Sequence, residues 1–264
     1  MIKLIATDMD GTFLNDENQF PREFPAVFEQ LKEKGIIFGA ASGRQYYNLA
    51  ERFGPLADDM LFIAENGSIV VYKDKEIFSN PMRPEAVKEV VEVARGIEGL
   101  HIVLCGKKAA YYENNSPEVL KEIDKYYTSR KHVTHFSEVE DDILKISLLD
   151  FQGAETHSYP SFKKFQGDLQ VTVGGYVWLD IMNEGSNKGI AMQRIQERLG
   201  ISPNDTMVFG DYLNDLELME KAYYSYAMAN AHDKIKEVSR FVTKWDNNES
   251  GVIETIKEAV LASK

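Results

Sequence analysis

Two aspartates, Asp8 and Asp10, follow a short apolar segment near the start of the chain and precede a glycine and a threonine. Two acids at the end of a strand suit two roles, because one carboxylate can attack phosphorus while the other moves the proton of the leaving group. Gly11 allows a sharp turn that brings backbone N–H groups near a phosphoryl oxygen. An ordinary Asx turn after a strand is the alternative interpretation.

A second acidic cluster contains Asp211, Asn214 and Asp215. These side chains offer the hard oxygen ligands that magnesium prefers. A phosphate about 4 Å from a carboxylate is repelled by roughly 4 kcal/mol per charge pair at an effective dielectric near 20. A divalent cation between them turns this repulsion into a net attraction. A turn with an N-cap is equally plausible for this cluster alone. Because Asp8 and Asp10 form another acidic cluster at a strand end, the two clusters together favour a Mg2+ site.

Three further residues could bind an anion. Ser42 and Gly43 follow an apolar segment and could donate hydrogen bonds to a transferring group, although a serine there is also a common N-cap. Lys188 stands at a predicted helix start, where the helix dipole opposes a cation. Neutralising a bound phosphate gives such a lysine a function, and a solvated surface lysine is the alternative.

Apolar segments alternate with segments of helical periodicity in the first and last parts of the chain, which predicts a parallel sheet with helices on both faces. The predicted strands cover residues 2–7, 36–41, 61–64 and 206–209, and the predicted helices cover 23–34, 45–53, 187–199 and 251–262. Ligands of such sheets bind outside the carboxyl ends of the strands. We therefore expect the polar residues above to converge.

The alternation changes after about residue 69, where a hairpin is followed by helices at 84–95 and 117–127 mixed with strands. This pattern predicts an α/β fold: a doubly wound, Rossmann-like core over residues 1–82 and 184–264, with an inserted α+β cap domain over 83–183. The insertion separates Ser42 from Lys188, so we expect it to select the leaving group. Tyr176 and Trp178 are candidates for that role, or else aromatic residues that pack on a strand.

Composition excludes several classes of partner. The formal net charge of −12 argues against a nucleic-acid surface, and no apolar stretch approaches the roughly 20 residues needed to span a bilayer. Cys105 is the only cysteine, so no intrachain disulfide is possible, which fits a cytoplasmic location. The short apolar start does not suit a signal peptide. A small phosphate ester is the expected partner, and no feature indicates an oligomeric state.

In order along the chain, these residues resemble the motifs of the haloacid dehalogenase superfamily, in its Cof-type sugar and flavin phosphatase branch. The likeness extends to bacterial sugar phosphatases and covers essentially the whole sequence. The segments that carry it are Asp8-Met9-Asp10-Gly11-Thr12-Phe13-Leu14, Ala41-Ser42-Gly43-Arg44, Glu65-Asn66-Gly67, Asn187-Lys188-Gly189, Gly210-Asp211-Tyr212-Leu213-Asn214-Asp215, Ala227-Met228-Ala229-Asn230-Ala231 and Asn248-Glu249-Ser250-Gly251.

The resemblance implies roles for the residues of the first three chemical motifs. Asp8 is the expected nucleophile, and Asp10 the expected general acid and then base. Ser42 and Lys188 are expected to bind the phosphoryl oxygens.

It also implies a metal site. Asp8, the backbone carbonyl of Asp10 and Asp211 are the expected Mg2+ ligands. Asn214 is expected to contact phosphate or support the site, and Asp215 is expected to lie behind the metal ligands and hold Lys188.

The resulting prediction is a magnesium-dependent phosphatase, a phosphoric monoester hydrolase that acts on sugar phosphates through an aspartyl-phosphate intermediate. Flavin mononucleotide, pyridoxal phosphate and nucleotides are alternative substrates. A phosphomutase and a non-catalytic binding protein are weaker alternatives. The first strand lacks the glycine pattern of a dinucleotide site, and no P-loop pattern is present.

Overall fold

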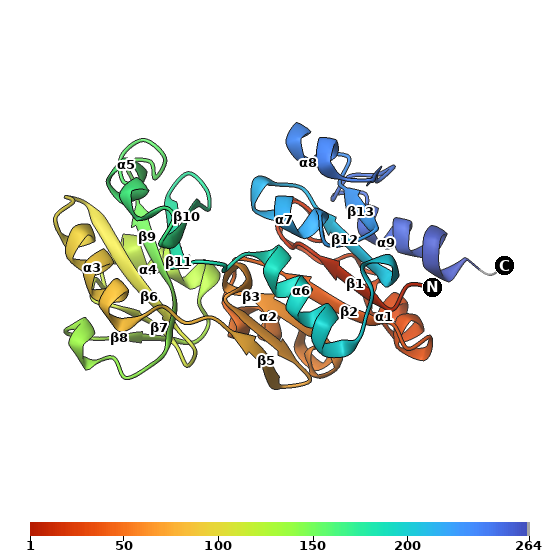
Figure 1. Cartoon of the computed structure of the whole chain (residues 1–264), viewed down its shortest axis with the longest axis horizontal. Helices are drawn as coiled ribbons and strands as arrows, with labels where there is room; N and C mark the ends of the chain where they lie inside the picture. Colours follow the sequence, from red (N-terminus) through yellow and green to blue (C-terminus); the bar gives the residue numbers. More distant parts are fainter. Residues whose placement is uncertain (263–264) are drawn as a thin grey trace. The chain divides into compact units, whose positions relative to one another are not determined.

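The computed structural model describes residues 1–262, and the chain divides into two compact units (Figure 1). The core unit comprises Met1–Ser42, Phe53–Phe78 and the chain from Asn187 onward. The cap unit comprises Gly43–Arg52 and Ser79–Ser186.

The prediction assigned residues 1–82 and 184–264 to the core, but residues 79–82 and 184–186 group with the cap unit, and so does an earlier segment. Gly43–Arg52 belongs to the cap unit. The Gln45 side chain donates to the carbonyl of Ser129 at 2.8 Å and accepts from its N–H at 2.9 Å. Arg44 Nη1 donates to the carbonyl of Lys125 at 3.3 Å. These bonds join residues about eighty positions apart, so local sequence periodicity does not reveal them.

The core unit is built on an eight-stranded sheet with the order β14-β13-β12-β1-β2-β3-β4-β5. Neighbouring strands from β14 to β3 are parallel, and β4 pairs antiparallel with β3. β1 lies between β12 and β2, so the carboxyl ends of these three strands are neighbours. The strands are β1 (Leu4–Thr7), β2 (Ile37–Ala41), β3 (Leu61–Ala64), β4 (Ile69–Tyr72), β5 (Lys75–Ser79), β12 (Thr206–Gly210), β13 (Tyr224–Ala227) and β14 (Phe241–Val242).

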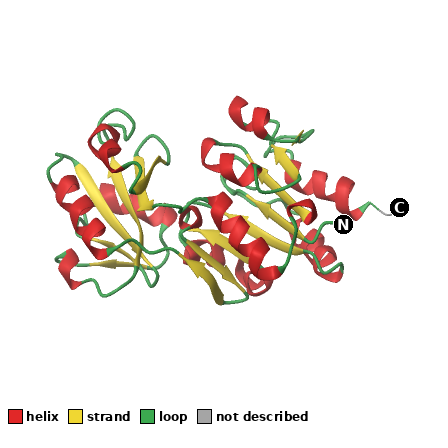
Figure 2. Ribbon diagram, viewed as in Figure 1, coloured by secondary structure: helices red, strands yellow, loops and turns green. Residues whose placement is uncertain are grey.

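Helices accompany the strands of this sheet, as Figure 2 shows. They are α1 (Phe24–Glu33), α6 (Lys188–Leu199), α7 (Leu216–Met219), α8 (Asp233–Val238) and α9 (Gly251–Ile256), which continues as a π-helical turn over Lys257–Leu261. α6 begins because the side chain of Asn187 accepts the N–H of Ile190 at 2.8 Å. It ends at Gly200, which adopts the left-handed conformation with a φ of 65°.

The cap unit contains a six-stranded sheet with the order β10-β11-β9-β6-β7-β8. Its strands and helices are α2 (Tyr46–Phe53, which reaches the core unit at its last residue), α3 (Pro84–Arg95), β6 (Leu100–Gly106), β7 (Ala110–Tyr112), α4 (Pro117–Tyr126), β8 (Arg130–His132), β9 (Ile143–Asp150), α5 (Tyr159–Phe162), β10 (Leu169–Val173) and β11 (Trp178–Asn183). Leu104 belongs to the same buried apolar cluster as Val90 of α3, whereas Cys105 belongs to a second cluster with Ile123 of α4. Because successive strand residues face opposite sides, α3 and α4 cover opposite faces.

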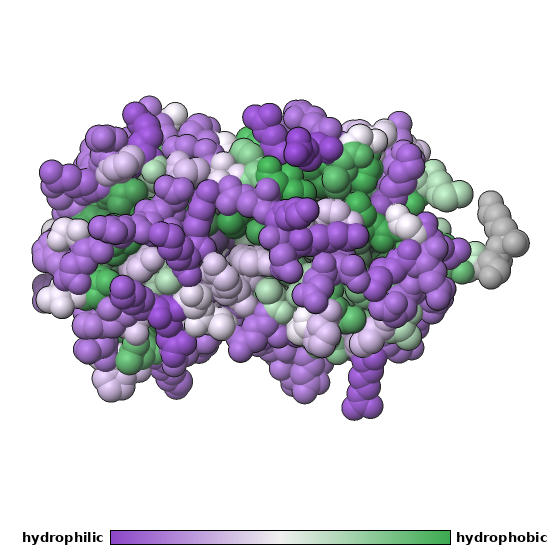
Figure 3. All heavy atoms as spheres, turned by 90° about the horizontal axis from the view of Figure 1, so that it is seen from below, coloured by the Kyte–Doolittle hydropathy of each residue, from purple (hydrophilic) through white to green (hydrophobic). Residues whose placement is uncertain are grey.

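Several short elements were not predicted, namely β7, β8, α5 and α8. All three residues of β8 are exposed, so this strand has no apolar alternation to detect. Hydrophilic residues dominate the face shown in Figure 3. Within residues 1–262, no helix has the length and apolar character required to cross a bilayer.

Candidate active site

Asp8 and Asp10 lie just beyond the carboxyl end of β1, at the centre of the core sheet. The N–H of Asp8 continues the pairing with β12 by donating to the carbonyl of Phe209 at 3.0 Å. Asp8 is buried and Asp10 is exposed. Gly11 then turns the chain with a φ of 77°, in the left-handed region that favours glycine.

This turn brings the first motif against Asp211, which follows β12. Thr12 Oγ1 donates to Asp211 Oδ1 at 2.7 Å. A Cβ added to Gly11 would lie 2.5 Å from Asp211 Oδ2, so only glycine leaves room for the carboxylate. The side-chain amide of Asn230 donates to the carbonyl of Gly11 at 2.8 Å and fixes the turn from another loop.

Lys188 joins the two acidic strand ends. Its ammonium group donates to Asp8 Oδ1 at 2.5 Å and to Asp215 Oδ1 at 2.7 Å. The second oxygen of Asp215 accepts the backbone N–H of Asp211 at 3.2 Å. Asp215 therefore holds both Lys188 and the loop that carries Asp211.

The other predicted residues occupy three different settings. Ser42 is buried after β2, where its N–H donates to Ile63 at 2.8 Å. The carbonyl of Gly43 accepts Lys145 Nζ at 2.8 Å within the cap unit. Asn214 lies half-buried in the 3-10 turn Leu213–Asp215. The proposed phosphate contacts of these residues stay predictions.

The cluster carries more negative than positive charge. Burial, together with the carboxylates of Asp215, Asp211 and Asp10, raises the pKa of Asp8 well above its usual value, against the opposing effect of Lys188. Burial and the Asp215 carboxylate raise the pKa of Asp211 to about 6. Burial lowers the pKa of Lys188, but Asp215 and Asp8 outweigh it and the net pKa is raised. The single positive charge of Lys188 therefore does not neutralise the carboxylates of this cluster.

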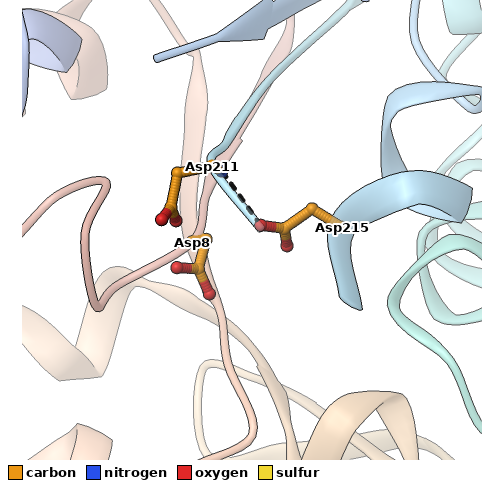
Figure 4. Close-up of side chains that lie close together, drawn as sticks. All are labelled: Asp8, Asp211 and Asp215. Carbon is orange, nitrogen blue, oxygen red and sulfur yellow. Dashed lines mark hydrogen bonds between the residues drawn. The ribbon is translucent and has the colours of Figure 1, made fainter. Parts of the chain in front are cut away.

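The donor set fits a divalent cation. Oxygen atoms of Asp8, Asp211 and Asp215 lie within 4.8 Å of one another. Figure 4 shows the carboxyl groups of Asp8 and Asp211 beside that of Asp215, which comes from the helical segment after β12. All are hard ligands of the kind that magnesium takes. Asp215 already uses its oxygens for Lys188 and for the Asp211 loop, which leaves Asp8 and Asp211 as the better ligands.

Sequence reasoning assigned no role to Thr12 or Asn230, although both belong to motifs that it identified. Thr12 fixes one oxygen of Asp211, and Asn230 fixes the Gly11 turn. Their positions inside two of the motifs were the one signal in the sequence that these residues could contribute to the site. Their partners are about two hundred residues away in the sequence, so their contacts could not be inferred.

A separate cavity of about 810 Å³ lies within the cap unit, lined by residues of α3 and of the segment 135–143. None of the candidate catalytic or metal-binding residues lines it. Its lining carries both acidic and basic side chains. The candidate site residues at the β1 and β12 strand ends are therefore separate from this cavity.

The model of one protein family, the haloacid dehalogenase-like hydrolases, matches residues 5–256. The chain belongs to this family. An Escherichia coli protein named 5-amino-6-(5-phospho-D-ribitylamino)uracil phosphatase YbjI is 34% identical over 262 residues, which cover 98% of this chain and 96% of that protein. A Bacillus subtilis protein of the same enzyme name, YcsE, is 26% identical over 261 residues, which cover 98% of this chain and 96% of that protein.

A solved structure shares the fold of this chain. The crystal structure of SMU.1108c from Streptococcus mutans superposes with a TM-score of 0.89 at 31% identity and covers 100% of both chains. The predicted family, the α/β fold class and the enzyme class, a phosphoric monoester hydrolase of the haloacid dehalogenase type, are confirmed.

Proposed function

We propose that this haloacid dehalogenase-like hydrolase is a magnesium-dependent phosphatase that forms a phosphoenzyme on Asp8. The observation that carries the proposal is the contact of Asp8 with Lys188, within a cluster that includes Asp211 and Asp215. A buried carboxylate held by one ammonium group presents its other oxygen as a nucleophile. Asp8 and Asp211 would hold the magnesium ion, with the carbonyl of Asp10, and the ion would offset their repulsion of the phosphate.

The residues of the chain divide the reaction into two steps. Asp8 attacks phosphorus, the bond from phosphorus to the ester oxygen breaks, and the proton of Asp10 moves to the departing oxygen. Water then attacks the phosphoenzyme, gives its proton to Asp10 and releases phosphate with Asp8 restored. Lys188 and Ser42 bind the phosphoryl oxygens, and charge-assisted hydrogen bonds of this kind are shorter and stronger than neutral ones.

We propose phosphate esters of polyhydroxylated carbon chains, above all sugar phosphates, as the substrates. The two relatives described above are named for a substrate with a 5-phospho-D-ribityl group, a phosphorylated sugar alcohol. That named compound is a second candidate, because two relatives share it. Flavin mononucleotide carries the same phosphorylated chain on a larger ring system, and pyridoxal phosphate and nucleotides complete the alternatives.

A phosphate-release screen tests the proposal. The full chain is incubated with hexose and pentose phosphates, the ribitylaminouracil phosphate, flavin mononucleotide, pyridoxal phosphate and nucleotides, with magnesium or with excess chelator. We expect several sugar phosphates to be hydrolysed, with activity lost in chelator and restored by magnesium. Undiminished turnover in chelator would contradict the metal requirement. Inert sugar phosphates beside one strongly preferred alternative would overturn the substrate class but leave the chemistry intact.

A further inference from the structure

The first turn of α6, which carries Lys188, lies between two backbone segments of the core unit. On one side, a Cβ added to Gly67 would lie 2.4 Å from the carbonyl oxygen of Asn187 and 3.1 Å from the nitrogen of Lys188. On the other side, a Cβ added to Gly189 would lie 2.4 Å from the carbonyl oxygen of Glu217 in α7. Neither contact leaves room for a methyl group, so the start of α6 has no space to shift toward either side.

The segment that carries Gly67 has an unusual backbone. Glu65, Asn66 and Gly67 have positive φ angles of 48°, 54° and 93°. Two of these residues are not glycine, so the turn costs free energy that the surrounding structure must offset. Conformations of this kind cluster where their geometry serves a function.

The same turn also holds the second phosphate-binding segment. The N–H of Asn66 donates to the carbonyl of Ser42 at 3.0 Å. The three-residue turn therefore contacts the Ser42 backbone through Asn66 and the Lys188 backbone through Gly67. The turn thus contacts two segments that belong to different motifs and are far apart in the sequence.

We propose that Asn66, Gly67 and Gly189 are positioning residues that clamp Ser42 and Lys188 relative to Asp8. The inference rests on the proposed function, because it assigns these residues to the phosphate-binding groups of that site. Lys188 Nζ lies 2.5 Å from Asp8 and 2.7 Å from Asp215. A displacement of α6 by one methyl radius would break this geometry, and misplacement of about 1 Å can cost on the order of 100-fold in rate.

Three alanine variants test the clamp. Gly67→Ala and Gly189→Ala introduce the two collisions. Gly200→Ala is the matched control, because Gly200 lies at the other end of α6, has a φ of 65° and would place its Cβ with no atom within 4 Å. It therefore adds the strain of alanine in a left-handed conformation without a collision. Gly189→Ala also places the better helix former in a helix, which favours folding if Gly67→Ala does not fold.

The measurements are kcat and KM for p-nitrophenyl phosphate, binding of inorganic phosphate by calorimetry, and Tm. We expect each clamp variant to lose about 100-fold in kcat/KM and about tenfold in phosphate affinity, the loss of one charge-assisted hydrogen bond. Gly200→Ala should lower Tm and leave both functional values within about twofold of wild type.

Different results would contradict the clamp and the proposed phosphatase function. If folded clamp variants match Gly200→Ala in kcat/KM and in phosphate binding, the clamp is wrong and the proposed function stands. If the wild type hydrolyses no ester, the proposed function fails. Phosphate binding by the three variants still tests the clamp in that case, because calorimetry does not require turnover.

Discussion

Asp8 and Asp10 stand two residues apart, yet their surroundings differ. Asp8 is buried and contacts Lys188, whereas Asp10 is exposed beyond the end of β1. A nucleophile benefits from a fixed position, and a proton donor needs access to the leaving group and to water. The burial of the two carboxylates therefore matches the division of roles that we propose.

Substitution separates the two roles. Asp8→Asn should abolish phosphoenzyme formation, because the amide is a poor nucleophile. Asp10→Asn should lower turnover by about 10²–10⁴-fold, the usual contribution of general acid–base catalysis. With an activated leaving group such as nitrophenolate, Asp10→Asn should still label Asp8 and then stall. Trapped phosphoenzyme and steady-state rates are the measurements, with Asp168→Asn, an exposed carboxylate of the cap unit, as the control. Near-native turnover of Asp8→Asn would refute the nucleophile assignment.

At the scale of elements, the loop after β1 is tied to the loop before α9. Asp16 accepts the side-chain amides of Asn247 at 3.0 Å and Asn248 at 3.2 Å. Asn247 also donates to the carbonyl of Leu14 at 3.0 Å. These contacts join a segment close to Asp8 in the sequence with one more than two hundred residues later. They give a structural reason for the Asn248-Glu249-Ser250-Gly251 motif.

This connection should depend on pH. The bonds from Asn247 and Asn248 lower the pKa of Asp16 below its ordinary value, so their contribution to stability is present above the unfolded-state pKa of about 3.9 and is lost as the pH falls through the lower folded-state pKa. Asp16→Asn should be less stable than wild type at neutral pH, and the difference should vanish in acid. Urea denaturation at a series of pH values measures this difference.

A double-mutant cycle supplies the control for that prediction. Asn248→Ala should show a similar loss at neutral pH, and the double variant should lose less than the sum of the two single variants. Additive losses, or a difference that persists in acid, would show that the Asp16 carboxylate does not act through this contact.

At the scale of the whole molecule, two of the points in the sequence where the chain changes from one unit to the other adjoin candidate site residues. Gly43 of the cap unit follows Ser42, and Ser186 of the cap unit precedes Asn187 and Lys188. The phosphoryl chemistry that we propose uses core residues, so we also propose that the cap unit selects the leaving group. Trp178 packs in the cap core against Tyr126 and Tyr127, whereas Tyr176 is 78% exposed.

The two aromatic residues should therefore behave differently. Tyr176→Ala should change the ranking of sugar phosphates while leaving p-nitrophenyl phosphate hydrolysis nearly intact, with discrimination of about 1–3 kcal/mol for each apolar contact. Trp178→Ala should mainly lower stability, by about 3–5 kcal/mol. Tyr223→Ala, which removes an exposed tyrosine of the core unit, is the control. An unchanged substrate ranking for Tyr176→Ala would exclude that residue as a specificity determinant.

Much of the core fold, and the position of the candidate site residues at one edge of its sheet, could be predicted from the sequence. Buried strands have apolar periodicity, and the carboxyl ends of parallel strands share one edge of a sheet. Asp8, Ser42 and Asp211 each follow such a strand, so their proximity to one sheet edge follows from the order of the elements. The motif letters then indicated the family.

Tertiary structure alone decided which backbones meet and which side chains pair. The contact of Gly67 with Asn187, the bond from Asn230 to Gly11 and the grouping of Gly43–Arg52 with the cap unit all join distant segments. Periodicity reports that a residue is buried, but it carries no information about the partner. That choice depends on the simultaneous packing of many side chains, since each close approach fixes the space left for the others.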